Sequence, residues 1–269
     1  MEKKSPKGEE LVKIINYNCN RISYYNRLLS LCKSDNEFES MINNISIKEI
    51  KDDKKNNAYY LKCKNDDKFI VVGSFKSDSD LTMHDLSDLA IPMTHYHVSK
   101  NNFIQDNFFH KITDEENIST LKLIQQLKLI DEKIKNLISE YIKNIDDTSP
   151  IANLIKKNNV KYDQNWKYNG IINKINDIEY INFHYFKKSF NKRTKIGTNI
   201  YYDNTYSKEI DELLSKNTDF CIYGNIYPII KINHVVVNEK NDNGKKIVCF
   251  TCKAYFNDIN FSSIYCNNK

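Results

Sequence analysis

The sequence contains little glycine and proline, with 6 Gly and 4 Pro among 269 residues, which excludes collagen-like and Gly/Pro-rich disordered classes. No apolar run approaches the length that spans a bilayer. The charged stretch "MEKKSPKGEE" at the start shows no apolar segment of a signal peptide. The seven cysteines are odd in number and irregular in spacing, unlike a secreted disulfide framework. We therefore expect an intracellular protein in a reducing compartment, with no membrane partner.

The common catalytic signatures are also absent. The chain contains no P-loop, no G-x-G-x-x-G, no G-x-S-x-G and no H-E-x-x-H. Cys249 and Cys252 form a single C-x-x-C, but a zinc site usually needs a second pair. Residues three apart in a strand also face opposite sides. These absences favour a binding protein without cofactors over an enzyme.

One region keeps an enzymatic alternative open. Four of the six histidines fall between residues 84 and 110, namely His84, His95, His97 and His110. His95 and His97 would share one face of a strand, as metal ligands sometimes do. No carboxylate motif accompanies them. A metal-dependent enzyme that uses the His84–His110 region is therefore the less favoured hypothesis.

The residues that are abundant are aromatic or basic. Aromatic residues make up 12% of the chain, and nearly all of them are Tyr (18) and Phe (13). Lysine, asparagine and isoleucine are frequent while arginine is rare, as AT-rich codons would produce, so lysine abundance alone carries no argument. The net charge of +5 is a mild excess, and the distribution of charge matters more than its total.

Sequence patterns divide the chain into three regions. Residues 1–8 are expected to form a disordered basic tail, residues 9–158 a mixed α/β and helical region, and residues 159–269 a β-rich region. In the second region, apolar periodicity predicts helices over 9–33 and 37–43. The segments "AYYLKC" and "KFIVVGSF" predict a hairpin around the turn "KNDD". A short helix is predicted around residues 80–90, and "IPMTHYHV" alternates like a strand.

The clearest predicted helix runs from Thr113 to Ile145. Thr113 and Glu116 have the spacing of a capping box. Apolar residues then recur at heptad spacing at Leu123, Leu127, Ile130, Ile134, Leu137 and Tyr141. This seam indicates a core helix or, alternatively, a contact between copies of the chain, and the core is the favoured interpretation. A shorter helix is expected from Pro150 to Lys157.

The last region reads as strands separated by turns. Five segments rich in Ile, Val, Tyr and Phe predict strands, namely "YINFHYF", "KIGTNIYY", "DFCIYGNIY", "PIIKINHVVV" and "KKIVCFTCKAYF". An Asn-Gly turn separates the last two, and "SKEIDELLSK" predicts one helix. Five strands with one helix is the composition of an OB-fold. The expected fold class is therefore α+β, with a C-terminal OB-like antiparallel β-barrel.

The segment from Tyr180 to Tyr202 is the predicted binding site. It holds seven aromatic rings and five cations without an acidic residue. Cations neutralise phosphates, and exposed rings stack on the bases of single-stranded nucleic acid. The candidate residues are Tyr180, His184, Phe186, Lys187, Lys188, Lys192, Arg193, Lys195, Tyr201 and Tyr202. An ordinary core hairpin with a solvated turn is the alternative. The segment "KKNNVKYDQNWKYNG" could extend the same surface.

The C-terminal segment "DFCIYGNIYPIIKINHVVVNEKNDNGKKIVCFTCKAYFND" resembles the closing strands of single-stranded DNA-binding proteins of large insect DNA viruses, such as the baculovirus DNA-binding protein. The shared pattern is a hydrophobic strand, a glycine, "YP", a Val/Ile strand, a polar turn and a strand that ends in "KAYF". The resemblance implies a cooperative, sequence-independent coat on replication intermediates, built around an OB-like core. Many such proteins end in an acidic tail, whereas this chain ends in "FSSIYCNNK".

The favoured hypothesis is a non-catalytic, sequence-independent single-stranded DNA-binding protein that acts in viral DNA replication or recombination. DNA is the preferred nucleic acid, the protein is expected to form homo-oligomers, and its expected location is the host nucleus or a viral replication site. The alternatives are a viral structural or scaffold protein that assembles through the helix at residues 113–145, and the metal-dependent enzyme.

Overall fold

The computed structural model describes residues 35–50, 59–66, 70–73, 91–100, 103–116, 118–158, 160, 166–184, 189–191, 194–196, 199–202, 205–206 and 220–268. The predicted basic tail, the helix over 9–33, the helix around 80–90 and the helix "SKEIDELLSK" lie outside these residues. The described part contains helices and mixed β-sheet, so the α+β class is confirmed. None of the described helices is both long and apolar enough to cross a bilayer.

The described elements follow the chain in a simple order. They are α2 (Asp35–Asn43), β1 (Ile45–Ile50), β2 (Tyr59–Asn65), β3 (Ile70–Gly73), β4 (Ile91–Lys100), β5 (Phe103–Lys111), α3 (Ile118–Lys143), α4 (Pro150–Lys157), β6 (Trp166–Asn169), β7 (Ile172–Ile175), β8 (Ile178–His184), β9 (Ser189–Asn191), β10 (Thr194–Ile196), β11 (Asn199–Tyr202), β12 (Thr205–Tyr206), β13 (Phe220–Asp242) and β14 (Lys245–Asn268). All but β9 and β10 among the strands belong to one 12-stranded sheet.

A hairpin of two very long strands organises this sheet. β13 and β14 pair antiparallel from Phe220↔Asn268 to Asp242↔Lys245. The expected Asn-Gly turn joins them, with Asn243 at φ 50° and Gly244 at φ 81°, the left-handed values that such a hairpin turn requires. The prediction of two strands on either side of "YP" was wrong, because β13 continues through Pro228. This proline lies between two register shifts, and irregular ladder positions of this kind accept a residue without an N–H.

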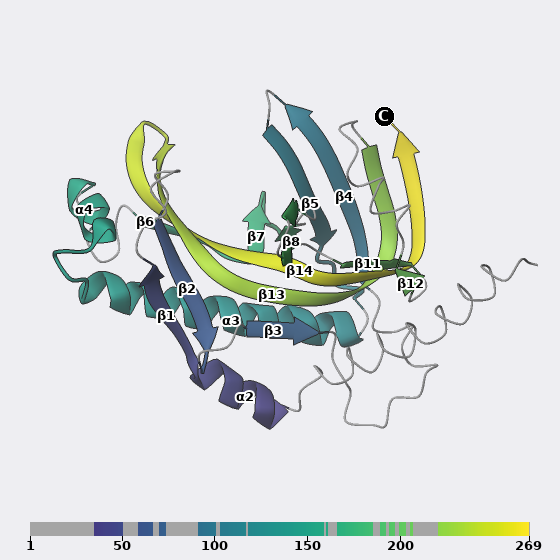
Figure 1. Ribbon diagram of the computed structural model, residues 1–269, viewed down its shortest axis with the longest axis horizontal. Coiled ribbons are helices and arrows are strands. Elements are labelled where there is room, and N and C mark those ends of the chain that lie inside the picture. The colour runs from purple at the N-terminus through teal and green to yellow at the C-terminus, as the bar shows by residue number, and fades with distance from the viewer. Residues whose placement is uncertain are drawn as a thin grey trace, which may run out of the picture.

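The hairpin is strongly bent. Its ladder shifts register at Asn225/Ile226, at Ile229/Ile230 and at Ile232/His234, and each such irregularity bends the strand and increases its twist. Figure 1 shows β13 and β14 curved into a U, with α3 along the convex side. The two faces of the hairpin therefore differ, because α3 covers the convex face and leaves the concave face uncovered.

The convex face holds the core. Alternate residues of β13 and β14, such as Val235, Val237 and Phe250, are fully buried together with the apolar seam of α3. Leu127 and Ile134 of that seam have no exposed surface. The core interpretation of the seam is confirmed, and in this fold its buried side chains cannot serve as a contact between copies. A hydrophobic seam at heptad spacing suits a sheet as well as a second helix.

Only half of the predicted capping box forms, and it lies before the helix, because α3 begins at Ile118 and not at Thr113 as predicted. The Thr113 backbone N–H donates to Oε1 of Glu116 over 2.9 Å. Oε1 of Glu116 lies 2.8 Å from Nε2 of His110 as well, and both of these side chains are nearly inaccessible to solvent. This contact ties the end of β5 to the turn that precedes α3.

Two strand predictions need correction. β2 and β3 both form, but not as a hairpin, because they follow one another along the same edge of β13, at residues 234–237 and 229–232 respectively. β2 pairs instead with β1. The strands β1, β5, β6 and β7 were missed altogether. Of these, β5 follows a recognisable signal. It returns from β4 after residues 101–102 with Lys100 opposite Phe103, and the two-residue connection "NN" is a hairpin signal that could have revealed it.

Five strands pair in a circuit that joins both halves of the chain. β13 pairs with β4, β4 with β5, β5 with β8, β8 with β14, and β14 with β13. The contact of β8 with β14 is a single parallel pair, His184↔Tyr255, so the barrel is not closed by a continuous ladder. β4 and β5 lie before residue 159. The circuit is thus not confined to the C-terminal region in which the OB-like barrel was predicted.

Candidate nucleic-acid interface

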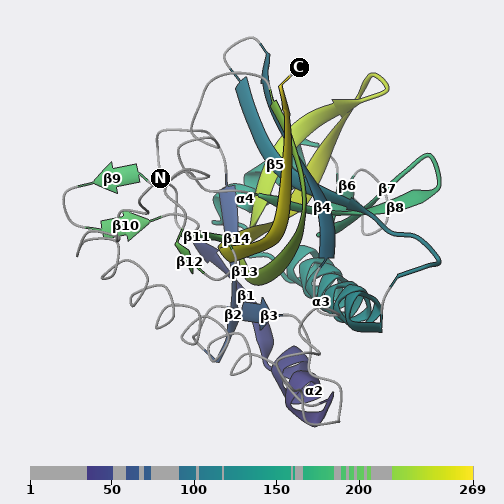
Figure 2. The ribbon, with the colours of Figure 1, turned by 90° about the vertical axis from the view of Figure 1, so that its right-hand side faces the viewer.

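The predicted hairpin between "YINFHYF" and "NIYY" does not form among the described residues. β8 pairs with β5, β7 and β14, while β11 pairs with β12 and runs parallel to β14. β9 and β10 make a separate two-stranded sheet, which stands away from the large one in Figure 2. The described residues of this segment are therefore distributed over several ladders and not over one hairpin.

The structure describes the candidate residues of that segment to different extents. Tyr180 is half-buried in β8, opposite Lys111. The neighbouring Ile181 and Phe183 are fully buried, so this face of the strand packs inward. For four candidates the backbone alone is described, namely His184, Lys195, Tyr201 and Tyr202. Phe186, Lys187, Lys188, Lys192 and Arg193 lie outside the described residues, and their binding role stays a prediction.

The structure reveals a second basic and aromatic surface on the concave face of the β13–β14 hairpin. Four residues lie in one row across four adjacent strands: Lys48 of β1 is opposite Lys62 of β2, Lys62 is opposite His234 of β13, and His234 is opposite Lys253 of β14. We call this row the basic ladder. Residues directly opposite in antiparallel strands point to the same face, and like charges placed there destabilise a sheet.

Aromatic rings flank the basic ladder. The Tyr60 and His234 ring centroids are 5.3 Å apart in an edge-to-face arrangement, and those of His234 and Tyr255 are 5.7 Å apart. The Tyr255 hydroxyl lies 3.3 Å from Nε2 of His234. Tyr60 is one row beyond the ladder toward the hairpin turn and Tyr255 one row before it. The three rings, which we call the aromatic cluster, thus cross the basic ladder diagonally.

Burial and neighbouring lysines lower the pKa values of several basic groups on this face. Burial, followed by the neighbouring Lys253 ammonium, lowers the pKa of His234 to about 4, so its imidazole is neutral at physiological pH. Burial and then Lys62 lower the pKa of Lys231. Burial and then Lys240 lower the pKa of Lys253. Clustered pKa perturbations of this kind are more frequent at functional sites than elsewhere.

The composition of this face fits a polyanion. Its outer positions Lys48, Lys167 and Lys240 are exposed, whereas Lys62 and Lys253 are partly buried. Among the described side chains of the face, the acidic one is Asp242, next to the hairpin turn. A surface that gathers lysines and partly exposed rings, while its one carboxylate lies at the far end, matches the chemistry of phosphates and bases.

The rings of "NWKYNG" do not belong to this surface. Trp166 packs edge-to-face on Phe250 with centroids 5.7 Å apart, on the core side of the sheet. The Tyr168 hydroxyl donates to Oδ1 of Asp131 in α3 over 2.7 Å. Lys156 and Lys157 form ion pairs with Asp147 and Glu239. The expectation that this segment extends an aromatic binding surface was therefore wrong for its two described rings, which stabilise the core.

The cysteine pair follows the geometry expected of a strand. Cys249 and Cys252 are both buried and carry free thiols, and burial raises the pKa of Cys252 well above its ordinary value. Among the described residues, no three His, Cys, Asp or Glu side chains gather as metal ligands. His110, the one candidate histidine whose side chain is described, contacts Glu116 instead.

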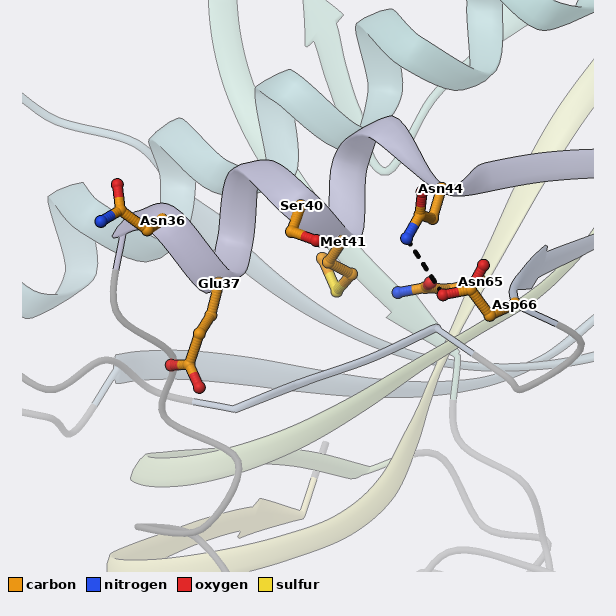
Figure 3. Close-up of a pocket in the computed structure, with 7 residues that line it drawn as sticks. All are labelled: Asn36, Glu37, Ser40, Met41, Asn44, Asn65 and Asp66. Atoms are coloured by element: carbon orange, nitrogen blue, oxygen red, sulfur yellow. Dashed lines mark hydrogen bonds between the residues drawn. The ribbon is translucent and has the colours of Figure 1, made fainter.

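A separate polar pocket of about 410 Å³ lies between α2 and the end of β2. It is lined by Asn36, Glu37, Ser40, Met41, Asn44, Asn65 and Asp66 (Figure 3). Nδ2 of Asn44 donates to Oδ2 of Asp66 over 3.0 Å. Glu37, the other carboxylate, lies at the opposite end of the pocket (Figure 3), so its charged groups do not converge on one point.

Comparison with protein-family models, with curated proteins and with solved structures finds no match to this chain. The function must therefore be argued from the concave face itself. Sequence reasoning missed this face, although "YYLKCK" places Tyr60, Lys62 and Lys64 at alternate positions. That alternation shows which residues share a side of β2, but it does not show that β13 and β14 add His234 and Lys253 to the same row.

Proposed function

We propose that the protein binds single-stranded nucleic acid, with DNA as the preferred form, without sequence specificity and without catalysis. The observation that carries this proposal is the coincidence of the basic ladder and the aromatic cluster on one concave face. Lysines neutralise phosphates, and rings stack on bases with about 1–3 kcal/mol per base. The ladder alone would attract any polyanion. The rings add a contact that requires exposed base faces, and a duplex hides these.

An OB-like barrel is part of this proposal. The circuit of β4, β5, β8, β14 and β13 has five strands and one weak junction, and an OB-fold is a five-stranded, partly open barrel. In that fold the connection between the fourth and fifth strands contributes to oligonucleotide binding. Here the corresponding strands in chain order are β13 and β14, and the basic ladder lies where their long hairpin extends beyond the circuit. The topology thus supports the binding role of the ladder.

The biological setting is also a proposal. The resemblance of the C-terminal segment to single-stranded DNA-binding proteins of large insect DNA viruses supports a role in viral DNA replication or recombination, at the host nucleus or a viral replication site. Formation of homo-oligomers stays a prediction. If it occurs, it uses a surface other than the buried seam of α3. That burial also removes the argument for a scaffold protein assembling through this helix.

The test compares two ligands of equal length. Fluorescence anisotropy should show tighter binding of labelled oligo(dT) than of a duplex, and Tyr60→Leu should weaken oligo(dT) binding by about 1–3 kcal/mol for the lost stack. The salt dependence of the variant should hardly change, because leucine removes a ring and no charge. Equal affinity for both ligands would show simple charge attraction and would reject the stacking mechanism.

A further inference from the structure

We infer that a bound single strand crosses the sheet perpendicular to the β-strands, with its phosphates along the basic ladder from β14 over β13 and β2 to the exposed edge at β1. This inference rests on the proposed function and adds the path and its direction. It identifies Lys48, which no sequence pattern indicated, as a phosphate contact at the end of the path.

The spacing of the ladder fits this path. Neighbouring strands of a sheet lie about 4.8 Å apart, so the four positions from Lys253 to Lys48 span roughly 14 Å. A few consecutive phosphates of an extended strand cover this length. The ladder begins at β14 close to the His184↔Tyr255 junction and ends at Lys48, which is exposed.

The alternative path would run along the strands toward the hairpin turn, and the distribution of charge does not favour it. The row that follows the basic ladder in that direction consists of Ile50, Tyr60, Val236, Thr251 and Asn169, none of which is charged. Nδ2 of Asn169 donates to the Thr251 hydroxyl over 3.3 Å. Lys240 lies beyond this neutral row, near Asp242. A phosphate chain along the strands would therefore cross a neutral row before it reached Lys167, opposite Cys249, and Lys240, whereas the basic ladder has no such gap.

The row beside the ladder offers a place for bases. Tyr60 stands next to Lys62 in β2, and Ile50, opposite Tyr60, is 43% exposed. A base attached to a phosphate near Lys62 or Lys48 would thus meet a ring and an apolar side chain on one side of the path. Near Lys253, at the other end of the path, Tyr255 offers a second ring. The arrangement separates the two contacts, with charge in one row and apolar surface in the adjacent rows.

Two single variants distinguish the paths. Lys48→Ala and Lys240→Ala each remove one exposed lysine from the same face, so neither disturbs the core and both lower the net charge equally. Anisotropy of labelled oligo(dT) at several salt concentrations should show that Lys48→Ala weakens binding several-fold and reduces the slope of log K against log salt by about 0.7. Lys240→Ala should change the slope clearly less than Lys48→Ala, because Lys240 lies beyond the neutral row and outside the basic ladder.

The remaining outcomes overturn the inference in different ways. If Lys240→Ala changes the slope and Lys48→Ala does not, the strand runs along the β-strands. If neither variant changes the slope while the unmodified protein binds oligo(dT), the path lies elsewhere and the proposed function stands. If the unmodified protein fails to bind oligo(dT), the proposed function and this inference are both rejected.

Discussion

The convex and concave faces of the β13–β14 hairpin are built from the same two strands, yet they follow opposite rules. On the convex side, Val235, Val237 and Phe250 pack against α3 with no exposed surface. On the concave side, the alternate residues His234 and Lys253 stand opposite each other in a row of basic groups. Since side chains alternate between the faces of a strand, one hairpin provides both a core and a charged surface.

The two faces also differ in how their polar groups are satisfied. On the convex side, the Asp131 carboxylate has hydrogen-bond donors. It accepts hydrogen bonds from Tyr168 and from the backbone N–H groups of Ile171 and Ile172, over 2.7–3.0 Å. The concave side instead places two like charges in register, with Lys48 directly opposite Lys62, at a cost in stability. Local arrangements that oppose stability are expected at functional sites, and a bound polyanion would relieve this one.

The largest expected effect comes from placing a charge in the convex core. Leu127→Asp buries an unpaired carboxylate at a position with no exposed surface and should lower the free energy of unfolding by more than about 4 kcal/mol. Leu129→Asp, two residues along the same helix and 49% exposed, should change it by less than about 0.5 kcal/mol. Urea denaturation followed by circular dichroism measures both. Equal effects would show that α3 does not pack as described.

A smaller loss of stability is expected when the Asp131 carboxylate, which accepts hydrogen bonds on the convex side, is removed. Asp131→Ala leaves the Tyr168 hydroxyl and two backbone N–H groups without their acceptor and should cost about 2–4 kcal/mol. Glu132→Ala removes a neighbouring exposed carboxylate and should be nearly neutral. The close approach of Gly170 to the Asp131 carboxylate predicts that Gly170→Ala also destabilises the protein. Thermal unfolding that is unchanged in Asp131→Ala would contradict this account.

On the concave face, His234 should make the free energy of unfolding depend on pH. The pKa of His234 is about 4 in the folded protein and about 6.5 in an unfolded chain, so protonation favours unfolding. Its contribution to stability is complete above pH 6.5 and is lost as the pH falls toward 4. The titratable side chains that face the ring are Lys62, Lys253, Tyr60 and Tyr255.

The measurement compares the unfolding free energy of the unmodified protein and of His234→Gln between pH 7 and 4. The unmodified protein should lose up to about 2 kcal/mol more than the variant, after allowance for the partial exposure of the ring. Carboxylates that titrate in this range are common to both proteins and cancel in the difference. Parallel curves for the two proteins would show that His234 is not held neutral by its surroundings.

Local patterns predicted the elements of the fold better than their partners. The seam of α3, the helix from Pro150 and the turn at Gly244 follow from residues close together in the sequence, and all three are confirmed. The pairing of β2 with β13 joins residues more than 170 positions apart. A short strand has no sequence signal for a partner at that distance, so the expected β2–β3 hairpin was wrong.

The candidate site shows the same limit. The segment from Tyr180 to Tyr202 was selected because its rings and cations are adjacent in the sequence. The basic ladder draws Lys48, Lys62, His234 and Lys253 from four strands, and each of them is unremarkable in a lysine-rich chain. Register, which sequence patterns fix only weakly, brings them into one row. Base stacking, which the aromatic content suggested, stays a prediction, and Trp166 and Tyr168 lie in the core.

The most direct test compares the removal of two lysines from the basic ladder with the removal of two lysines elsewhere. The double variant Lys62→Ala/Lys253→Ala removes the centre of the basic ladder. Its matched control, Lys128→Ala/Lys174→Ala, removes two lysines that pair with Glu179 and Asp177 away from the concave face. Both lower the net charge by two, so simple charge attraction predicts the same effect for each.

Binding of labelled oligo(dT) at several salt concentrations decides between the two explanations, after thermal melts confirm that both variants fold. We predict that the ladder variant lowers the slope of log K against log salt by about 1.4, or about 0.7 for each lost phosphate contact, and that the control keeps the slope of the unmodified protein. Equal changes in the two variants, or an unchanged slope in the ladder variant, would contradict the assignment of the concave face as the nucleic-acid site.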